Sequence, residues 1–204
     1  MLYHERRAKK DGYRVIVGVD EAGRGPLAGP VVASAVILKS YRFTARVDDS
    51  KKLTAAQRSR AFDEIIRKSF YAVGIMNQGV VDSVNIAVAA HLAVDEAVMR
   101  LMGRLTAPPP ERQVILLLDG RLSSGLPYRA KEIIGGDGAS LSIAAASIIA
   151  KVIRDRMMVI YDRIYPQYGF SDHKGYGTER HRDCIAAYGL SPLHRRTFCR
   201  HFST

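Results

Sequence analysis

The chain has 204 residues, 47% of them hydrophobic and 25% charged, which suits a globular protein long enough to bury a core. Its 31 Lys and Arg residues outnumber its 20 Asp and Glu residues, and the net charge of +11 favours a polyanionic partner. No apolar run approaches the roughly 18 residues of a membrane-spanning helix, the N-terminus lacks a signal-peptide segment, and two cysteines give no disulfide framework. We therefore expect a cytoplasmic protein without a membrane segment.

The chain opens with a basic arm, residues 1–13, and continues with two apolar runs that predict strands over 14–19 and 31–38. The carboxylates of Asp20 and Glu21 follow the point where the first strand should end. Acidic residues at strand ends often hold divalent cations, because hard ions take oxygen ligands. The alternative is that both are ordinary solvated turn residues.

A glycine-rich turn joins these two strands. Gly23 and Gly25 flank Arg24, so bare backbone amides lie beside a guanidinium. Glycine is favoured where the backbone needs positive φ or where a ligand approaches the main chain. The turn therefore suits a phosphate or a sugar hydroxyl.

The segment GVDEAGRGPLAGPV, residues 18–31, resembles the opening motif of type 2 ribonuclease H, the bacterial ribonuclease HII. Further matching blocks extend the resemblance over residues 15–198. It implies an α/β, ribonuclease H-like fold: a five-stranded mixed sheet flanked by helices, with a small helical C-terminal segment. We expect a catalytic domain over 14–164, with residues 165–204 packed on it as a substrate-binding segment.

The next block, DSKKL at 49–53, is also typical of that family and precedes a predicted helix over 55–68. Thr54 and Gln57 have the spacing of a capping box, and Phe62, Ile65 and Ile66 should be buried. A positive charge just before the N-terminus of a helix is unfavourable for the helix dipole. The position of Lys51 and Lys52 therefore favours a role in phosphate contact. Two solvated loop lysines are the alternative.

A strand is predicted over 70–76 and a long helix over 82–102, capped by Asp82. The apolar residues of that helix recur with a period near 3.6 and predict its buried face. They are Val84, Val88, Leu92, Val98 and Met99.

Two later strands each lead to an aspartate. The run 113–118 is apolar throughout, as a central strand should be, and delivers Asp119 followed by glycine. The predicted strand 130–134 leads to Asp137, which by itself could be a turn residue. The resemblance implies that both aspartates are metal ligands. One departure is Ala139, where the family commonly carries lysine.

A helix over 140–163 follows and carries Lys151 and Arg154, suited to phosphate contact or, for Lys151 with Asp155, to a surface ion pair. The tail from 165 sets aromatic residues among cations, which suits a sugar-phosphate strand or a small aromatic core. Its HKGYGT block places His173, Lys174 and Tyr176 in a family motif whose tyrosine meets the nucleotide beside the scissile position. An H-R-R-x-F block at 194–198 also matches.

A zinc site is disfavoured. The spacings H-x-x-C at 181–184 and C-x-H at 199–201 match no standard zinc motif.

Four clustered carboxylates require cations to remain ionised together, and an oxygen-only set favours Mg²⁺ or Mn²⁺. We expect two ions, bound by Asp20, Glu21, Asp119 and Asp137.

The resemblance implies a monomeric endoribonuclease. Its substrates would be RNA paired to DNA and single ribonucleotides embedded in duplex DNA, cut on the 5′ side of the ribonucleotide. Main-chain groups of residues 23–25 would bond the 2′-hydroxyl, Tyr176 would pack on the neighbouring deoxyribose, and phosphates would meet a set of cations. That set is Lys51, Lys52, Lys151, Arg154 and Lys174. The alternatives are a type 3 ribonuclease H, for which residues 1–13 are too short to form the extra domain, and a non-catalytic basic duplex-binding protein.

Overall fold

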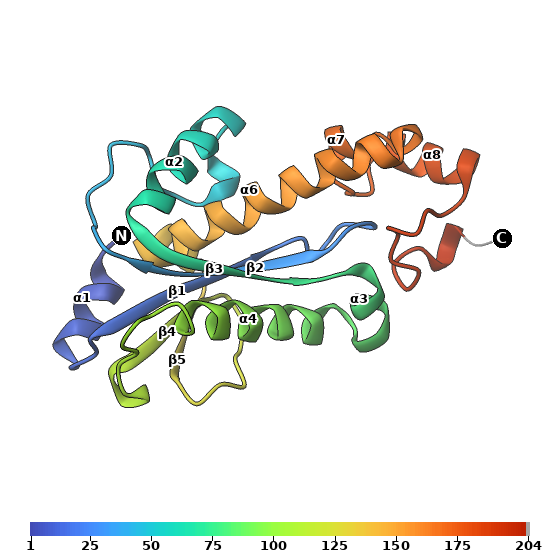
Figure 1. Ribbon diagram of the computed structural model, residues 1–204. Helices are drawn as coiled ribbons and strands as arrows, with labels where there is room; N and C mark the ends of the chain where they lie inside the picture. Colours follow the sequence, from blue (N-terminus) through green and yellow to red (C-terminus); the bar gives the residue numbers. More distant parts are fainter. Residues whose placement is uncertain (203–204) are drawn as a thin grey trace.

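The computed structural model describes residues 1–202. A five-stranded sheet in the order β3-β2-β1-β4-β5 forms its centre (Figure 1). The strands are β1 (Val15–Ala22), β2 (Val31–Leu38), β3 (Ser69–Met76), β4 (Val114–Asp119) and β5 (Arg129–Ile133). The pairs β1/β2 and β2/β3 are antiparallel, while β1/β4 and β4/β5 are parallel. This is the mixed sheet that the sequence resemblance predicted.

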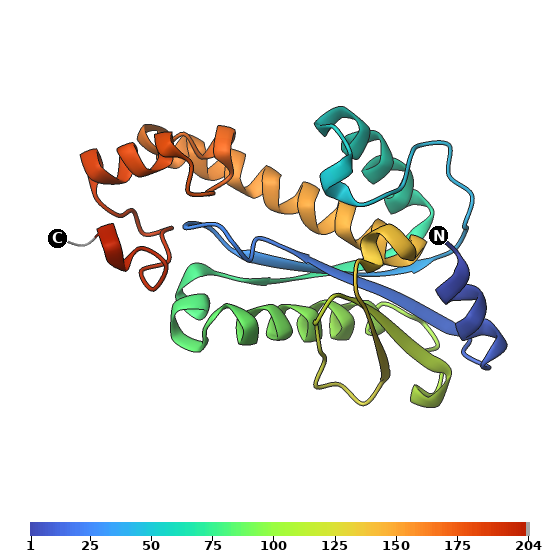
Figure 2. The ribbon, with the colours of Figure 1, turned by 180° about the vertical axis from the view of Figure 1, so that it is seen from behind.

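Helices cover both faces of the sheet (Figures 1 and 2). The α-helices are α1 (Tyr3–Lys10), α2 (Ala55–Arg67), α3 (Gln78–Val84), α4 (Ile86–Met102), α5 (Gly136–Ala139), α6 (Leu141–Ile164), α7 (Phe170–His173) and α8 (Glu179–Tyr188). Short 3₁₀ helices are η1 (Ser50–Lys52), η2 (Glu111–Gln113), η3 (Pro166–Tyr168) and η4 (Arg200–Phe202). α4 packs on one face of the sheet and α2 and α6 on the other, so two apolar cores enclose it. None of the helices within residues 1–202 combines the length and hydrophobicity needed to cross a bilayer.

Local sequence signals are confirmed at α2. The Thr54 hydroxyl accepts from the Gln57 amide, and the Gln57 side chain accepts from the Thr54 amide, which completes the capping box. Phe62 and Ile65 are buried, and Ile66 is partly buried against the same core. The residues of the basic arm form a helix of their own, α1, which buries Glu5 against the start of α6.

The predicted single helix over 82–102 is wrong. Asn85 has a φ of 68°, so the chain breaks there into α3 and α4. The side chain of Asn85 caps α4 by accepting from the amides of Ala87 and Val88. Asp82, predicted to be the cap, lies inside α3 and accepts instead from the amides of residues 196 and 197 near the C-terminus.

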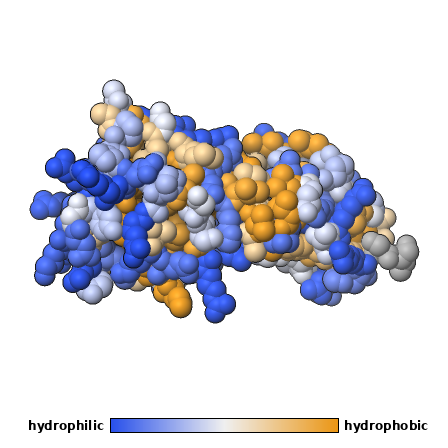
Figure 3. Space-filling model, turned by 90° about the horizontal axis from the view of Figure 1, so that it is seen from below, coloured by the Kyte–Doolittle hydropathy of each residue, from blue (hydrophilic) through white to orange (hydrophobic). Residues whose placement is uncertain are grey.

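The predicted buried face of this helix is also largely wrong. Val88, Leu92 and Met99 are exposed, and the buried face of α4 is rich in alanine. The cause is the close approach of α4 to β3, since a Cβ built on Gly74 would lie 2.0 Å from the Ala93 carbonyl oxygen. Only small side chains fit at this contact, so alanines occupy it, and the larger buried residues of α4, such as Val98 and Leu101, lie elsewhere on the helix. Figure 3 shows apolar side chains gathered on the underside of the molecule.

Residues 165–202 pack on the far end of α6 and extend the molecule beyond the sheet (Figure 1). Tyr168 and Phe170 are buried there with stacked rings 5.4 Å apart. For these two residues the small aromatic core is the correct interpretation. An isolated bridge between Ala28 and His194 joins this segment to the turn between β1 and β2.

Candidate active site

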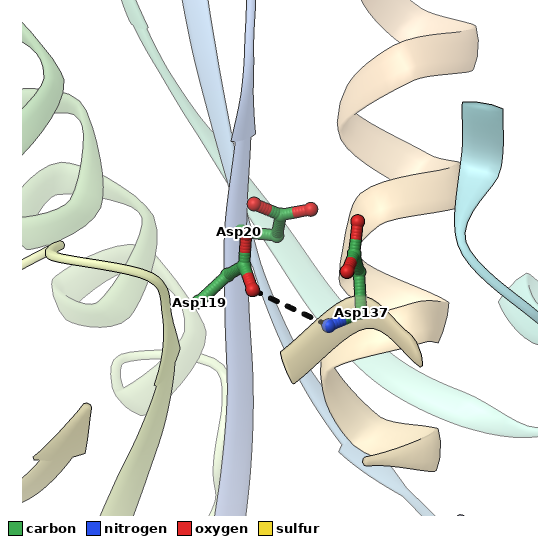
Figure 4. Close-up of side chains that lie close together, drawn as sticks. All are labelled: Asp20, Asp119 and Asp137. Carbon is green, nitrogen blue, oxygen red and sulfur yellow. Dashed lines mark hydrogen bonds between the residues drawn. The ribbon is translucent and has the colours of Figure 1, made fainter. Parts of the chain in front are cut away.

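Three aspartates meet on the α6 face of the sheet (Figure 4). In the parallel pair β1/β4, Val19 is in register with Leu118, so the next residues, Asp20 and Asp119, lie side by side. Asp137 reaches them from the one-turn helix α5, which follows β5. One carboxylate oxygen from each aspartate lies within 4.8 Å of the others. Residues that lie far apart in the chain, at positions 20, 119 and 137, therefore form one acidic cluster.

Backbone amides hold this cluster in place. Asp119 Oδ1 accepts from the amide of Gly136 at 2.7 Å and from that of Asp137 at 3.3 Å, the latter drawn in Figure 4. Asp20 Oδ1 accepts from the amide of Glu21 at 2.7 Å. The first contacts tie the end of β4 to the start of α5. They fix Asp137 relative to Asp119 before any ligand binds.

The electrostatics of the cluster favour a bound cation. Burial, followed by the charges of Glu21 and Asp119, raises the pKa of Asp20 well above its ordinary value. Burial and the charge of Asp119 likewise raise the pKa of Asp137. Three carboxylates this close are unfavourable when ionised alone, and an all-oxygen set matches hard divalent ions. The residues present therefore fit a magnesium-type or manganese-type site.

Glu21 lies outside the acidic cluster. β1 continues to Ala22, so the predicted strand end at residue 19 is wrong and both carboxylates belong to the strand. The Glu21 carboxylate is not one of the three whose oxygens lie within 4.8 Å of one another, but its charge still raises the pKa of Asp20. Glu21 Oε1 lies 3.4 Å from Arg24 Nη1.

The glycine turn and the HKGYGT block lie against each other. Gly175 accepts a backbone hydrogen bond from Leu27 at 2.8 Å, and a Cβ built on Gly25 would lie 3.9 Å from the ring of Tyr176. Tyr176 is 43% exposed, so its ring is available to a ligand. Gly23 has a φ of 99°, which requires glycine.

The predicted phosphate-binding lysines differ in their surroundings. Lys51 is 80% exposed, with Nζ 3.7 Å from Asp137 Oδ2, so it lies beside the acidic cluster. Lys52 Nζ lies 3.8 Å from Asp48 Oδ1. Lys151 makes the predicted ion pair with Asp155 at 2.8 Å, and its Nζ also lies 5.7 Å from the centre of the Tyr176 ring. The Lys174 ammonium donates to the carbonyl of Ser171.

Two residues predicted to bind substrate are buried. Arg154 is fully buried, and its guanidinium donates to backbone carbonyls rather than facing solvent, so direct phosphate contact is wrong for it. His173 is buried with both ring nitrogens bonded to the backbone of Tyr168 and Gly175. Both side chains hold the backbone of the site through hydrogen bonds instead.

Sequence reasoning missed two residues of the site. Ser147, on α6, lowers the pKa of Asp20 against the effect of burial, and its hydroxyl donates to Ser50 Oγ at 2.8 Å. Its only sequence signal is a serine in an otherwise apolar run. Arg195 lies fully buried against the glycine turn, and its only sequence signal is its place in the H-R-R-x-F block, which by itself implies no role.

A mixed sheet of this strand order, with aspartates converging from β1, β4 and the helix after β5, defines a nuclease of the ribonuclease H-like class. The sequence comparisons make this more specific. The family model described as ribonuclease HII matches residues 17–202. The ribonuclease HII of Geobacter sulfurreducens is 52% identical over 195 residues, covering 95% of this chain and 86% of that protein. The chain belongs to the ribonuclease HII family, and it is a metal-dependent endoribonuclease acting on RNA-DNA hybrids.

Solved structures agree with this fold. The ribonuclease H2 of Pyrococcus horikoshii OT3 superposes with a TM-score of 0.73 at 25% identity, covering 92% of this chain and 96% of that one. The Bst-RNase HIII structure in complex with Mn²⁺ superposes with a TM-score of 0.67 at 20% identity, covering 89% and 65%. The second likeness concerns the fold alone.

Proposed function

We propose that this enzyme also cuts duplex DNA on the 5′ side of a single embedded ribonucleotide, by two-metal-ion hydrolysis of the phosphodiester. The observation that carries the proposal is the cluster of Asp20, Asp119 and Asp137 within 4.8 Å, close to a glycine turn whose amides at 23–25 donate to no acceptor within residues 1–202. A cluster of this kind supplies the chemistry, and the turn supplies recognition of the sugar.

Asp20 and Asp119 would hold one cation between them, with Asp137 and Glu21 completing the ligand set for a second. Mg²⁺ or Mn²⁺ is favoured because every candidate ligand is a carboxylate oxygen. When bound, such ions lower the pKa of a water and supply positive charge to the phosphate oxygens. All four carboxylates come from one chain, which supports a monomeric enzyme.

The remaining residues bind and orient the substrate. Amides of residues 23–25 would donate to the 2′-oxygen, which deoxyribose lacks, and the exposed ring of Tyr176 would pack on the adjacent deoxyribose. Lys51, Lys52, Lys151 and Lys174 would neutralise phosphates, so affinity should fall steeply as salt rises. Lys51 is the best placed of these cations, because it lies beside Asp137.

A duplex DNA containing one ribonucleotide tests the proposal. Incubation with Mg²⁺ or Mn²⁺ should give one cut on the 5′ side of the ribose, leaving a 5′-phosphate, and EDTA should prevent it. Asp20→Asn should lower the rate by about 10³-fold or more. Asp63→Asn, an exposed aspartate on α2, is the matched control and should retain the wild-type rate. An intact duplex with either metal, beside normal cleavage of an RNA-DNA hybrid, would overturn the proposal.

A further inference from the structure

Two arginines lie fully buried behind the glycine turn, residues 23–30, which joins β1 to β2. Arg154 comes from α6, and Arg195 from the segment between α8 and η4. Within residues 1–202, neither guanidinium has a carboxylate oxygen within 4.0 Å. Burying a cation without an ionic partner is costly unless polar groups surround it. The surrounding groups are backbone carbonyls, almost all from the turn itself.

Arg195 binds both sides of the turn. Its Nη2 donates to the carbonyl of Gly23 at 2.6 Å, its Nη1 to that of Arg24 at 3.0 Å, and its Nε and Nη2 to that of Gly29 at 3.0 and 2.9 Å. Four bonds in a fixed fork determine the orientation of the peptide planes they reach.

Arg154 continues this arrangement next to Arg195. It donates to the carbonyls of Pro30 at 2.9 Å, Ala28 at 3.1 Å and Lys174 at 3.0 Å. The last bond connects the turn to the loop that carries Tyr176. A Cβ on Gly23 would lie 2.2 Å from Arg154 Nε, so glycine at this position also makes room for the guanidinium.

The orientation of the carbonyls decides where the amides point. In a trans peptide the C=O of one residue and the N–H of the next point in opposite directions. Because Arg195 holds the carbonyls of Gly23 and Arg24, the amides of Arg24 and Gly25 must point away from it. Within the part of the chain that the structure describes, the amides of residues 23–25 donate to no protein acceptor, whereas those of Leu27 and Gly29 are bonded to carbonyls.

We infer that Arg195 and Arg154 are positioning residues that hold the amides of the glycine turn ready for the ribose, and so determine discrimination between ribose and deoxyribose. The inference rests on the proposed function, in which this turn recognises the 2′-hydroxyl. Burial and the neighbouring charge of Arg154 lower the pKa of Arg195 to about 10, so it remains protonated at neutral pH.

Binding of two duplexes, identical except for one ribonucleotide, tests this inference. In an Asp20→Asn background, which prevents turnover, the ratio of the two dissociation constants measures ribose discrimination. Arg195→Lys should reduce the ratio about tenfold or more, toward one, because a single ammonium cannot reproduce the fork. The affinity for the all-DNA duplex should change less than about twofold. Arg196→Lys is the matched control, an exposed neighbour with the same change of side chain.

Arg154→Lys provides a second variant should Arg195→Lys fold poorly, and its ratio should fall in the same direction. Hydrogen exchange of the peptide covering residues 23–30 should accelerate in either variant, with no change in peptides from α4. A wild-type ratio of one would overturn the reading of the sugar by the turn. A high wild-type ratio that both variants retain would overturn the role of the arginines alone.

Discussion

A Cβ built on Gly18 would lie 2.1 Å from the carbonyl carbon of Ser142, so β1 and the first turn of α6 touch backbone to backbone. Gly18 precedes Asp20 by two residues on the same face of β1, and Ser142 follows Asp137 by five. The contact therefore constrains the spacing of two aspartates of the acidic cluster. It also explains why the α6 face admits Ser147 close to Asp20.

Replacing this glycine should separate the two elements. Gly18→Ala should lower the free energy of unfolding by about 1–3 kcal/mol, because an added methyl must displace rigid backbone. The cleavage rate should fall by more than the loss of folded protein explains, since α6 carries Ser147 and adjoins Asp137. Urea unfolding and hybrid cleavage measure the two effects. Gly103→Ala, where φ is −65° and the nearest atom lies 3.4 Å away, should change neither appreciably. Equal effects of the two substitutions would contradict the prediction.

Asp20→Asn should stabilise the metal-free protein while inactivating it. Burial raises the pKa of Asp20, so its ionised form destabilises the fold increasingly as pH rises from about 4 through the raised pKa. Removing the charge should therefore raise the free energy of unfolding at pH 7 by about 1 kcal/mol or more.

Thermal unfolding with EDTA and with Mn²⁺ checks this prediction. The variant should melt above the wild type in EDTA and gain less from Mn²⁺ than the wild type does. A lower melting temperature in EDTA would show that Asp20 stabilises the empty site.

The buried pair His181 and His194 should make the C-terminal segment sensitive to acid. His194 Nδ1 accepts from the amide of Ser191, so its Nε2–H must donate to His181 Nε2, 3.0 Å away, and His181 Nδ1–H then donates to the carbonyl of Tyr176. A further proton on either ring would place two N–H groups against each other. Burial is the main cause that lowers both pKa values, to about 4 each.

A histidine with a depressed pKa stabilises the fold above its ordinary value of about 6.5, and this contribution is lost as pH falls toward 4. The loss at pH 5 should be roughly 2 kcal/mol for each ring. Hydrogen exchange between pH 7 and 5 should show residues 165–202 opening before β1 and β4. Uniform protection across the chain at pH 5 would contradict the prediction.

Glu5 should stabilise the start of α6 from a distance of more than 130 residues in sequence. Its Oε1 accepts from Ser140 Oγ at 2.7 Å and from the amide of Ser142 at 2.9 Å. Glu5→Ala would leave both buried donors unpaired and should cost about 1–3 kcal/mol by urea unfolding. Glu5→Gln keeps the acceptor oxygen and should lose less. Arg6→Ala, an exposed neighbour on α1, should be close to neutral, and a loss equal to that of Glu5→Ala would reject the role of the carboxylate.

The sequence by itself determined the elements whose signals are local. The β-branched runs of β1 and β2, the capping box of α2 and the apolar run of β4 each act within a few residues, and the structure contains all of them. Asp119 could also be selected from sequence, because a carboxylate closing a buried strand has no packing role, whereas the selection of Asp20 and Asp137 depended on the family resemblance.

Only the tertiary structure decided which side chains share a face and which are buried. Glu21 lies outside the three-aspartate cluster although it adjoins Asp20. Val88, Leu92 and Met99 of α4 face outward because alanines of α4 occupy its close contact with β3. Arginine is usually exposed in folded proteins, yet Arg154 and Arg195 are both fully buried beneath the glycine turn. Burial of a charge depends on partners far away in the chain, here backbone carbonyls that become available only after the sheet and the C-terminal segment have assembled.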